Sequence, residues 1–343
     1  MSGANADGQL GYRDQLGHRI AVTAEQVGQR FPLWADPETG VWTTSRRGSW
    51  TGGFWAGLLG LGGQPERARR AWDDLARWRD ADTACRGLIF WYGGLASPGW
   101  ERLDRKRLGW QRLRAAAASL ARDFDPELRA VPWGTAFGSS GARLRVDAVA
   151  GLVPLLGWAG WTDVAREHLR THLRWCFDGA AVQPSFVADG TWIPADEPPR
   201  GTARAHAWLL LGCVDGARWV DAQFREAAVA LAQAWSTRFG PGVPLADADL
   251  PDGPLDTSAA AITAVALLKL SAVTGQRSWW RDGSDLLHRT ADRALVRTGP
   301  ARGALGGGCY DARSGLAPAH ELIWGDFFCA AGLGLVAGNL QDV

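Results

Sequence analysis

Two kinds of segment alternate along this chain of 343 residues. One kind carries charge on one face and apolar residues at helical spacing on the other: in 103–124, the apolar positions Trp110, Leu113, Ala117 and Leu120 recur every three or four residues. The other kind is almost uncharged and rich in Gly, Ala and aromatic residues, as in 256–270. The first pattern predicts helices with one solvated face, whereas a helix that is apolar all round has to be buried.

The order of these segments predicts an all-α fold. The amphipathic segments are 12–31, 65–79, 103–124, 161–177, 219–239 and 277–297, and the uncharged ones are 49–61, 83–95, 147–160, 202–212, 256–270 and 324–338. Such alternation favours an (α/α)6 toroid of six helical hairpins with the uncharged helices inside. We expect one domain over 1–343, with 1–10 as a disordered tail. A helical superhelix is the alternative, although it would not need six fully buried helices.

The charge balance and the cysteine pattern exclude several classes of protein. With 37 Lys and Arg against 36 Asp and Glu, no strong field steers the chain to nucleic acid or a membrane surface. Five scattered cysteines predict buried thiols, not a disulfide framework or a zinc site. No P-loop, dinucleotide fingerprint or metal-ligand cluster is present. We expect a cytoplasmic monomer or homodimer that acts on a small molecule without cofactor or metal.

Polar residues stand at the beginnings of the uncharged segments: Ser49, Asp147, Thr202, Asp256 and Asp326. Helix capping favours these residue types at such positions for backbone reasons alone. In a toroid, however, alternate helices run in the same direction, so all six beginnings would surround one mouth. A ligand site is expected there.

Five strings in order resemble one known family. They are SWTGGFWAGLLGL (49–61), VDAVAGLVPLLGWA (146–159), RAHAW (204–208), LDTSAAAITAVALLKL (255–270) and WGDFF (324–328). Together they resemble the unsaturated glucuronyl and rhamnogalacturonyl hydrolases of the six-hairpin glycosidase superfamily. The resemblance implies hydration of the C4=C5 vinyl ether of an unsaturated uronic acid. An acid protonates one alkene carbon, water adds to the other, and the hemiketal opens with loss of the glycosidic bond.

The resemblance implies that Asp147 is the general acid and base. The uncharged string after it would favour a protonated carboxyl. The sequence also departs from the family. A second family aspartate lies in a T-H-D-x-G-F string, but this chain has TACRGL at 83–88, with Cys85 in place of the acid. The family's H-Q-G segment before the RAHAW string is absent as well.

The remaining candidates would bind substrate. Arg204 offers a fork for a carboxylate, or a structural ion pair. Trp208 follows it at i+4 on the same side of a helix. Further candidates, each also explicable as a core residue, are Trp42, Trp50, Trp91, Trp133, His206 and Cys85.

Three functions remain open. The first is a glycoside hydrolase-like enzyme for an unsaturated sugar. The second is a repurposed relative that isomerises or cyclises a non-sugar alkene in natural-product biosynthesis, because Cys85 makes the site less polar. The third is a non-catalytic sugar-binding relic that uses only aromatic side chains. Because family residues are missing, we expect standard unsaturated glucuronides to be poor substrates.

Overall fold

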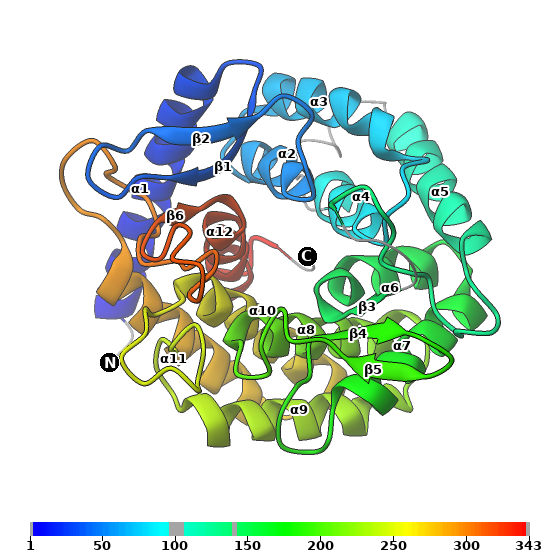
Figure 1. Ribbon diagram of the computed structural model, residues 1–343. Helices are drawn as coiled ribbons and strands as arrows, with labels where there is room; N and C mark the ends of the chain where they lie inside the picture. The colour runs from blue at the N-terminus through cyan, green and yellow to red at the C-terminus, as the bar shows by residue number, and fades with distance from the viewer. Residues whose placement is uncertain (1–2, 96–105, 139–142, 341–343) are drawn as a thin grey trace.

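The computed structural model describes residues 3–95, 106–138 and 143–340, and these contain twelve α-helices in two concentric rings (Figure 1). The inner ring consists of α2 (Gly52–Leu61), α4 (Arg86–Leu95), α6 (Val149–Trp158), α8 (Ala203–Trp219), α10 (Thr257–Thr274) and α12 (Ile323–Val336). The outer ring consists of α1 (Gly3–Val27), α3 (Pro65–Asp74), α5 (Lys106–Arg122), α7 (Thr162–Cys176), α9 (Phe224–Phe239) and α11 (Arg277–Ala294).

The inner ring is closed. Each inner helix packs against the next one along the chain, and α12 packs against α2. The predicted (α/α)6 toroid is thereby confirmed, and the open superhelix is wrong because such a superhelix would leave its first and last hairpins apart. Helix α1 begins at Gly3, within the segment expected to be a disordered tail.

Glycines bring the inner helices close together. A Cβ built on Gly87 would lie 2.2 Å from the backbone nitrogen of Leu152, and one built on Gly151 would lie 2.3 Å from that of Leu88. The backbones of α4 and α6 therefore touch where only hydrogen atoms fit. This contact explains why the uncharged segments contain so much glycine.

Helix α10 is long and apolar enough to cross a membrane by length and composition. However, 78% of it is buried inside the toroid. It is the one such helix among the described residues, and this burial is that of a core helix. The five cysteines are buried and free, as the sequence predicts.

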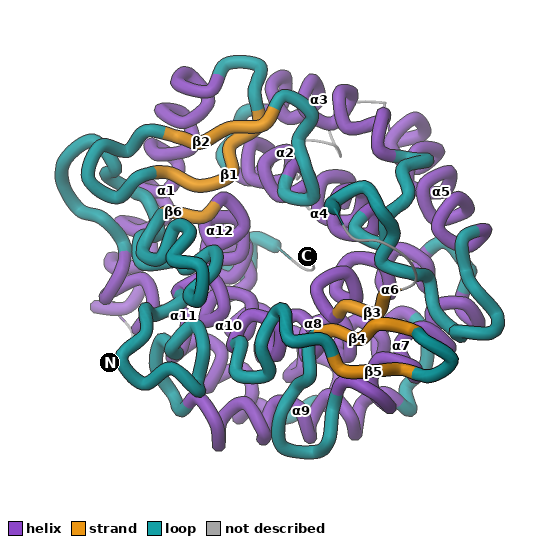
Figure 2. Tube along the Cα trace, in the orientation of Figure 1, coloured by secondary structure: helices purple, strands orange, loops and turns teal. Residues whose placement is uncertain are grey.

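Two small antiparallel sheets lie at one end of the ring. The first, in the order β2-β1-β6, consists of β1 (Phe31–Ala35), β2 (Trp42–Ser45) and β6 (Glu321–Leu322). The second, β3-β4-β5, consists of β3 (Arg143–Arg145), β4 (Ser185–Ala188) and β5 (Trp192–Pro194). Figure 2 shows the strands and long loops on the face turned to the viewer. Because these strands precede inner helices along the chain, the inner helices begin at this mouth.

Candidate functional site

Asp147 lies at the mouth, in a short 3-10 turn (Val146–Ala148) between β3 and α6. Its partner is Arg145, whose Nε and Nη2 both lie 3.1 Å from Asp147 Oδ2. Both side chains are partly open to solvent, at 21% exposure for Asp147 and 23% for Arg145. The predicted acid therefore lies where a ligand could reach it, in an ion pair that sequence reasoning missed.

The other face of the Arg145 guanidinium is aromatic. Its Cζ lies 4.5 Å from the ring centre of Trp133, a stacking distance for a cation on an indole. The carbonyl of Trp133 accepts a hydrogen bond from the Ala84 backbone at 3.1 Å. Trp133 is thus tied to the segment that begins α4 and lies beside Asp147 through Arg145.

Cys85 lies in the same neighbourhood. Burial raises the pKa of its thiol, and the nearby negative charge of Asp147 raises it further. The thiol is therefore neutral at pH 7 and cannot act as a thiolate nucleophile. The structure brings Cys85 next to Asp147, but as an uncharged group.

Arg204 lies in the first turn of α8. Its Nη1 donates to Asp256 Oδ2 at 2.8 Å and to the Cys309 carbonyl, and its Nη2 donates to the Tyr310 carbonyl at 2.6 Å. Burial lowers the pKa of Arg204, but the carboxylates of Asp256 and then Asp147 raise it more, so the net shift is upward. Arg204 is close enough to Asp147 to feel its charge, yet much of its fork is already occupied.

Aromatic rings continue the cluster. Arg204 Cζ lies 5.6 Å from the Trp324 ring, which contacts Trp50 at 4.8 Å between ring centres. Tyr310 contacts Trp324 at 5.6 Å. Trp208 is fully buried one layer deeper, stacked 5.9 Å from Phe54. Of the predicted aromatic residues, Trp133 therefore adjoins Arg145 and Trp50 packs against the Trp324 ring beside Arg204, whereas Trp208 is buried among core aromatic residues.

Three candidates have the contacts of ordinary core residues. Trp42 is buried and its Nε1 donates to Thr23 Oγ1 at 3.2 Å. Trp91 is buried and packs edge-on against Trp219 at 5.8 Å. His206 Nε2 lies 2.8 Å from the carbonyl of Leu231 in α9, and burial lowers the pKa of this histidine to about 4.

The polar beginnings of two other inner helices have structural contacts. Asp256 caps α10, and its carboxylate accepts hydrogen bonds from the Ser258 backbone and hydroxyl. Asp326 accepts a hydrogen bond from the Leu305 backbone at 2.9 Å. Burial and the neighbouring Glu321 raise the pKa of Asp326 well above its usual range.

Two buried histidines on α7 support the site from behind. His168 Nδ1 accepts a hydrogen bond from the Val131 backbone at 3.1 Å. His172 Nδ1 lies 2.8 Å from the His168 carbonyl, and its Nε2 lies 3.2 Å from the Arg145 carbonyl. The i, i+4 spacing of these histidines is visible in the sequence, but their targets depend on the fold.

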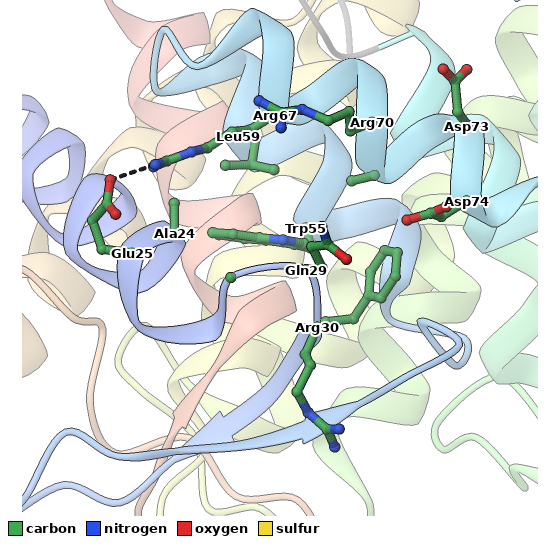
Figure 3. A pocket seen from close by; sticks show the side chains of 13 residues that line it. Ala24, Glu25, Gln29, Arg30, Trp55, Leu59, Arg67, Arg70, Asp73 and Asp74 are labelled. Carbon is green, nitrogen blue, oxygen red and sulfur yellow. Dashed lines mark hydrogen bonds and ion pairs between the residues drawn. The ribbon is translucent and has the colours of Figure 1, made fainter.

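Two cavities in the outer wall do not contain this cluster. One, of about 470 Å³, lies between α1 and α3 and mixes charges of both signs around Trp55 (Figure 3). Another, of about 720 Å³, lies between α7 and the β4–β5 hairpin. Among the described residues, no three His, Cys, Asp or Glu side chains are grouped to hold a metal ion.

Comparison with known proteins yields one curated relative and several similar structures. Unsaturated glucuronyl hydrolase of Bacillus sp. strain GL1 is 26% identical over 92% of this chain and 94% of its own length. The crystal structure of that enzyme has a TM-score of 0.84 at 21% identity, covering 97% of this chain and 98% of the other. No family model matches the chain.

Two further structures have the same fold. An unsaturated glucuronyl hydrolase with dGlcA-Glc-Rha-Glc has a TM-score of 0.86 at 22% identity, covering 97% of each chain. The Streptococcus agalactiae enzyme has a TM-score of 0.80 at 17% identity, covering 97% of this chain and 92% of the other. Sequence likeness over almost the whole chain and a shared toroid agree with the five strings, and they support a glycoside hydrolase-like function. In sequence over almost its whole length, and in fold, the chain therefore resembles unsaturated glucuronyl hydrolase.

Proposed function

We propose that this protein hydrates the vinyl-ether double bond of an unsaturated uronyl sugar, with Asp147 as general acid and base. The observation that carries the proposal is the position of Asp147, which is partly exposed, ion-paired with Arg145, and near enough to Arg204 that its charge raises the pKa of that arginine. The ring of Trp133 adjoins Arg145, that of Trp324 adjoins Arg204, and Trp50 packs against Trp324. Aromatic faces of this kind suit a sugar ring.

The chemistry needs one proton donor and one water. The protonated Asp147 carboxyl gives its proton to C4, and the C4=C5 π electrons form the new C–H bond. Water adds to C5 and returns a proton to Asp147, so the carboxyl is regenerated. The resulting hemiketal opens and breaks the glycosidic bond. Because the Cys85 thiol is neutral, Asp147 serves both proton transfers in this proposal.

The charges favour this substrate over an apolar alkene. Guanidiniums near the acid would be poorly solvated by a hydrocarbon, whereas a sugar carboxylate can pair with a guanidinium. The contacts of Arg145 and Arg204 therefore weigh against the isomerase or cyclase alternative. A non-catalytic sugar-binding relic needs no acid, so a measurement of turnover distinguishes it from an enzyme.

Asp147→Asn is the direct test. The amide keeps the shape but cannot deliver a proton, and loss of a general acid costs about 10²–10⁴-fold in rate. Turnover is measured as loss of ultraviolet absorbance from an unsaturated glucuronyl disaccharide. Asp163→Asn, at a 91% exposed carboxylate on outer helix α7, is the matched control and should leave the rate unchanged. An unaltered rate in Asp147→Asn would overturn the assignment. Lack of turnover both in the wild type and in Cys85→Asp would favour the relic.

A further inference from the structure

Arg145 and Arg204 differ in the number of acceptors that they bind within the described part of the chain. A guanidinium has five N–H donors. Arg204 spends donors on three protein acceptors, namely Asp256 and the carbonyls of Cys309 and Tyr310. Arg145 aims Nε and Nη2 at a single oxygen, Asp147 Oδ2. Arg145 is also the more exposed of the two, at 23% against 15% for Arg204.

We propose that Arg145, rather than Arg204, selects an anionic substrate by binding its carboxylate. This inference rests on the proposed function for the identity of the sugar. A carboxylate that pairs with the Arg145 fork competes with Asp147 for the same donors. Binding of the anion thereby releases Asp147 from its ion pair with Arg145.

Neighbouring residues fix the position and orientation of the Arg145 guanidinium. The ring of Trp133 supports one face of the guanidinium at 4.5 Å, which restricts the plane in which a carboxylate can pair. His168 holds the backbone at Val131, two residues before Trp133, and His172 contacts the backbone of Arg145 itself. Both histidines lie on α7, so one outer helix sets the position of the arginine and of its aromatic support. His168 and His172 are positioning residues in this proposal.

The test measures binding separately from turnover. The probes are a disaccharide that ends in saturated glucuronic acid, which lacks the reacting double bond, and its uncharged methyl ester. Isothermal titration calorimetry should show that the wild type binds the acid about tenfold or more tightly than the ester, as expected for a hydrogen-bonded charge pair. Arg145→Gln should bind acid and ester equally. Arg145→Lys should keep part of the preference, because it keeps charge but not the planar fork.

Arg166→Gln is the matched control. Arg166 on α7 is 25% exposed and also pairs with carboxylates, those of Asp163 and Asp221, but it is not part of the site. It should retain the wild-type preference. Circular dichroism and thermal unfolding establish that each variant is folded, and His172→Gln should reduce the preference without abolishing binding of the ester.

The outcomes separate this inference from the proposed function. A preference for the acid that survives in Arg145→Gln overturns the inference, as does a wild type that binds both probes equally or binds neither. Turnover of the unsaturated disaccharide is measured in parallel with wild type. Acid-selective binding through Arg145 without turnover overturns the proposed function and leaves the inference standing. Turnover by the wild type, together with an undiminished preference for the acid in Arg145→Gln, supports the proposed function and overturns the inference.

Discussion

Single residues of the site were partly predictable. The strings around Asp147 and Arg204 pointed to two charged groups that the structure brings close together at the mouth. Arg145 lies only two residues before Asp147, yet nothing in the local sequence shows that its side chain turns back onto that carboxylate. That geometry depends on pairing of Arg145 with Ser185 across β3 and β4, and on the contact with His172. These are contacts between segments, which local patterns do not report.

Cys85→Asp should raise activity on an unsaturated glucuronyl disaccharide above the wild type, which we expect to be poor. The neutral buried thiol cannot accept a proton from water, whereas a carboxylate beside Asp147 could. The measurement is kcat/KM from the loss of alkene absorbance. Cys85→Asn, with nearly the same shape but no charge, is the control and should give no gain. A wild type with kcat/KM of about 10⁴ M⁻¹s⁻¹ or more would show that the missing aspartate is dispensable.

Acid should destabilise the fold through its buried histidines. Burial lowers the pKa of His172 to about 4, below the value of about 6.5 in an unfolded chain. Between these values the unfolded chain binds more protons, so the free energy of unfolding falls as the pH falls from about 6.5 to about 4. Each such histidine should contribute about 2 kcal/mol of loss between pH 7 and pH 5.

His172→Gln should reduce this pH dependence. Urea unfolding at the two pH values gives the difference, which is independent of any constant destabilisation by the substitution. His18→Gln, at an exposed position on α1, is the control and should leave the difference unchanged. An equal difference in wild type and His172→Gln would contradict the prediction.

At the scale of helices, hydrophobic pattern was a sufficient guide to which elements are inside. The uncharged segments became the inner helices, because no face of them tolerates water. The six short strands among the described residues were not predicted. Strands of two to five residues carry too few positions for an alternation to stand out, and their pairing is fixed by helices that lie far apart in sequence.

Gly151→Ala tests the close approach of α4 and α6. The added methyl would meet backbone atoms at Gly87 and Leu88, which cannot move without shifting a whole helix. Overpacking of this kind costs about 1–3 kcal/mol or more of unfolding free energy. Gly17→Ala on α1 is the control, because a Cβ there meets nothing within 4 Å. That substitution should stabilise the protein by about 0.5–1 kcal/mol, since alanine favours a helix.

At the scale of the whole molecule, the lengths of the loops between helices determine at which end of the ring the site lies. The connection from α2 to α3 is residues 62–64 and that from α10 to α11 is 275–276, whereas the one from α7 to α8 spans 177–202. Long connections lead into the inner helices and carry the strands, so they build the mouth (Figure 1). The alternation of amphipathic and uncharged segments predicted the ring of helices. The conformation of these loops was not predictable, because it depends on contacts between segments that come together only when the ring closes.

Closure of the ring joins the first hairpin to the last. Arg19 on α1 donates from Nε to Glu321 Oε1 at 2.8 Å, and Glu321 lies on β6, which pairs with β1. Both side chains are almost fully buried, at 3% and 2% exposure. Removing one partner of a buried ion pair strongly lowers the free energy of unfolding, because the remaining charge stays buried without a partner. The stability of the ring should therefore depend on this contact between segments 302 residues apart.

Arg19→Met should lower the free energy of unfolding by about 3–5 kcal/mol, because it leaves the Glu321 carboxylate buried without its partner. Arg19→Met combined with Glu321→Leu removes both charges and should recover most of that loss. Arg67→Met, which breaks an exposed pair with Glu25 elsewhere on the first hairpins, is the control and should cost about 1 kcal/mol or less. Chemical unfolding followed by circular dichroism measures all four proteins. A double variant less stable than Arg19→Met alone would mean that shape at this seam, and not pairing of the charges, holds the first hairpin to the last.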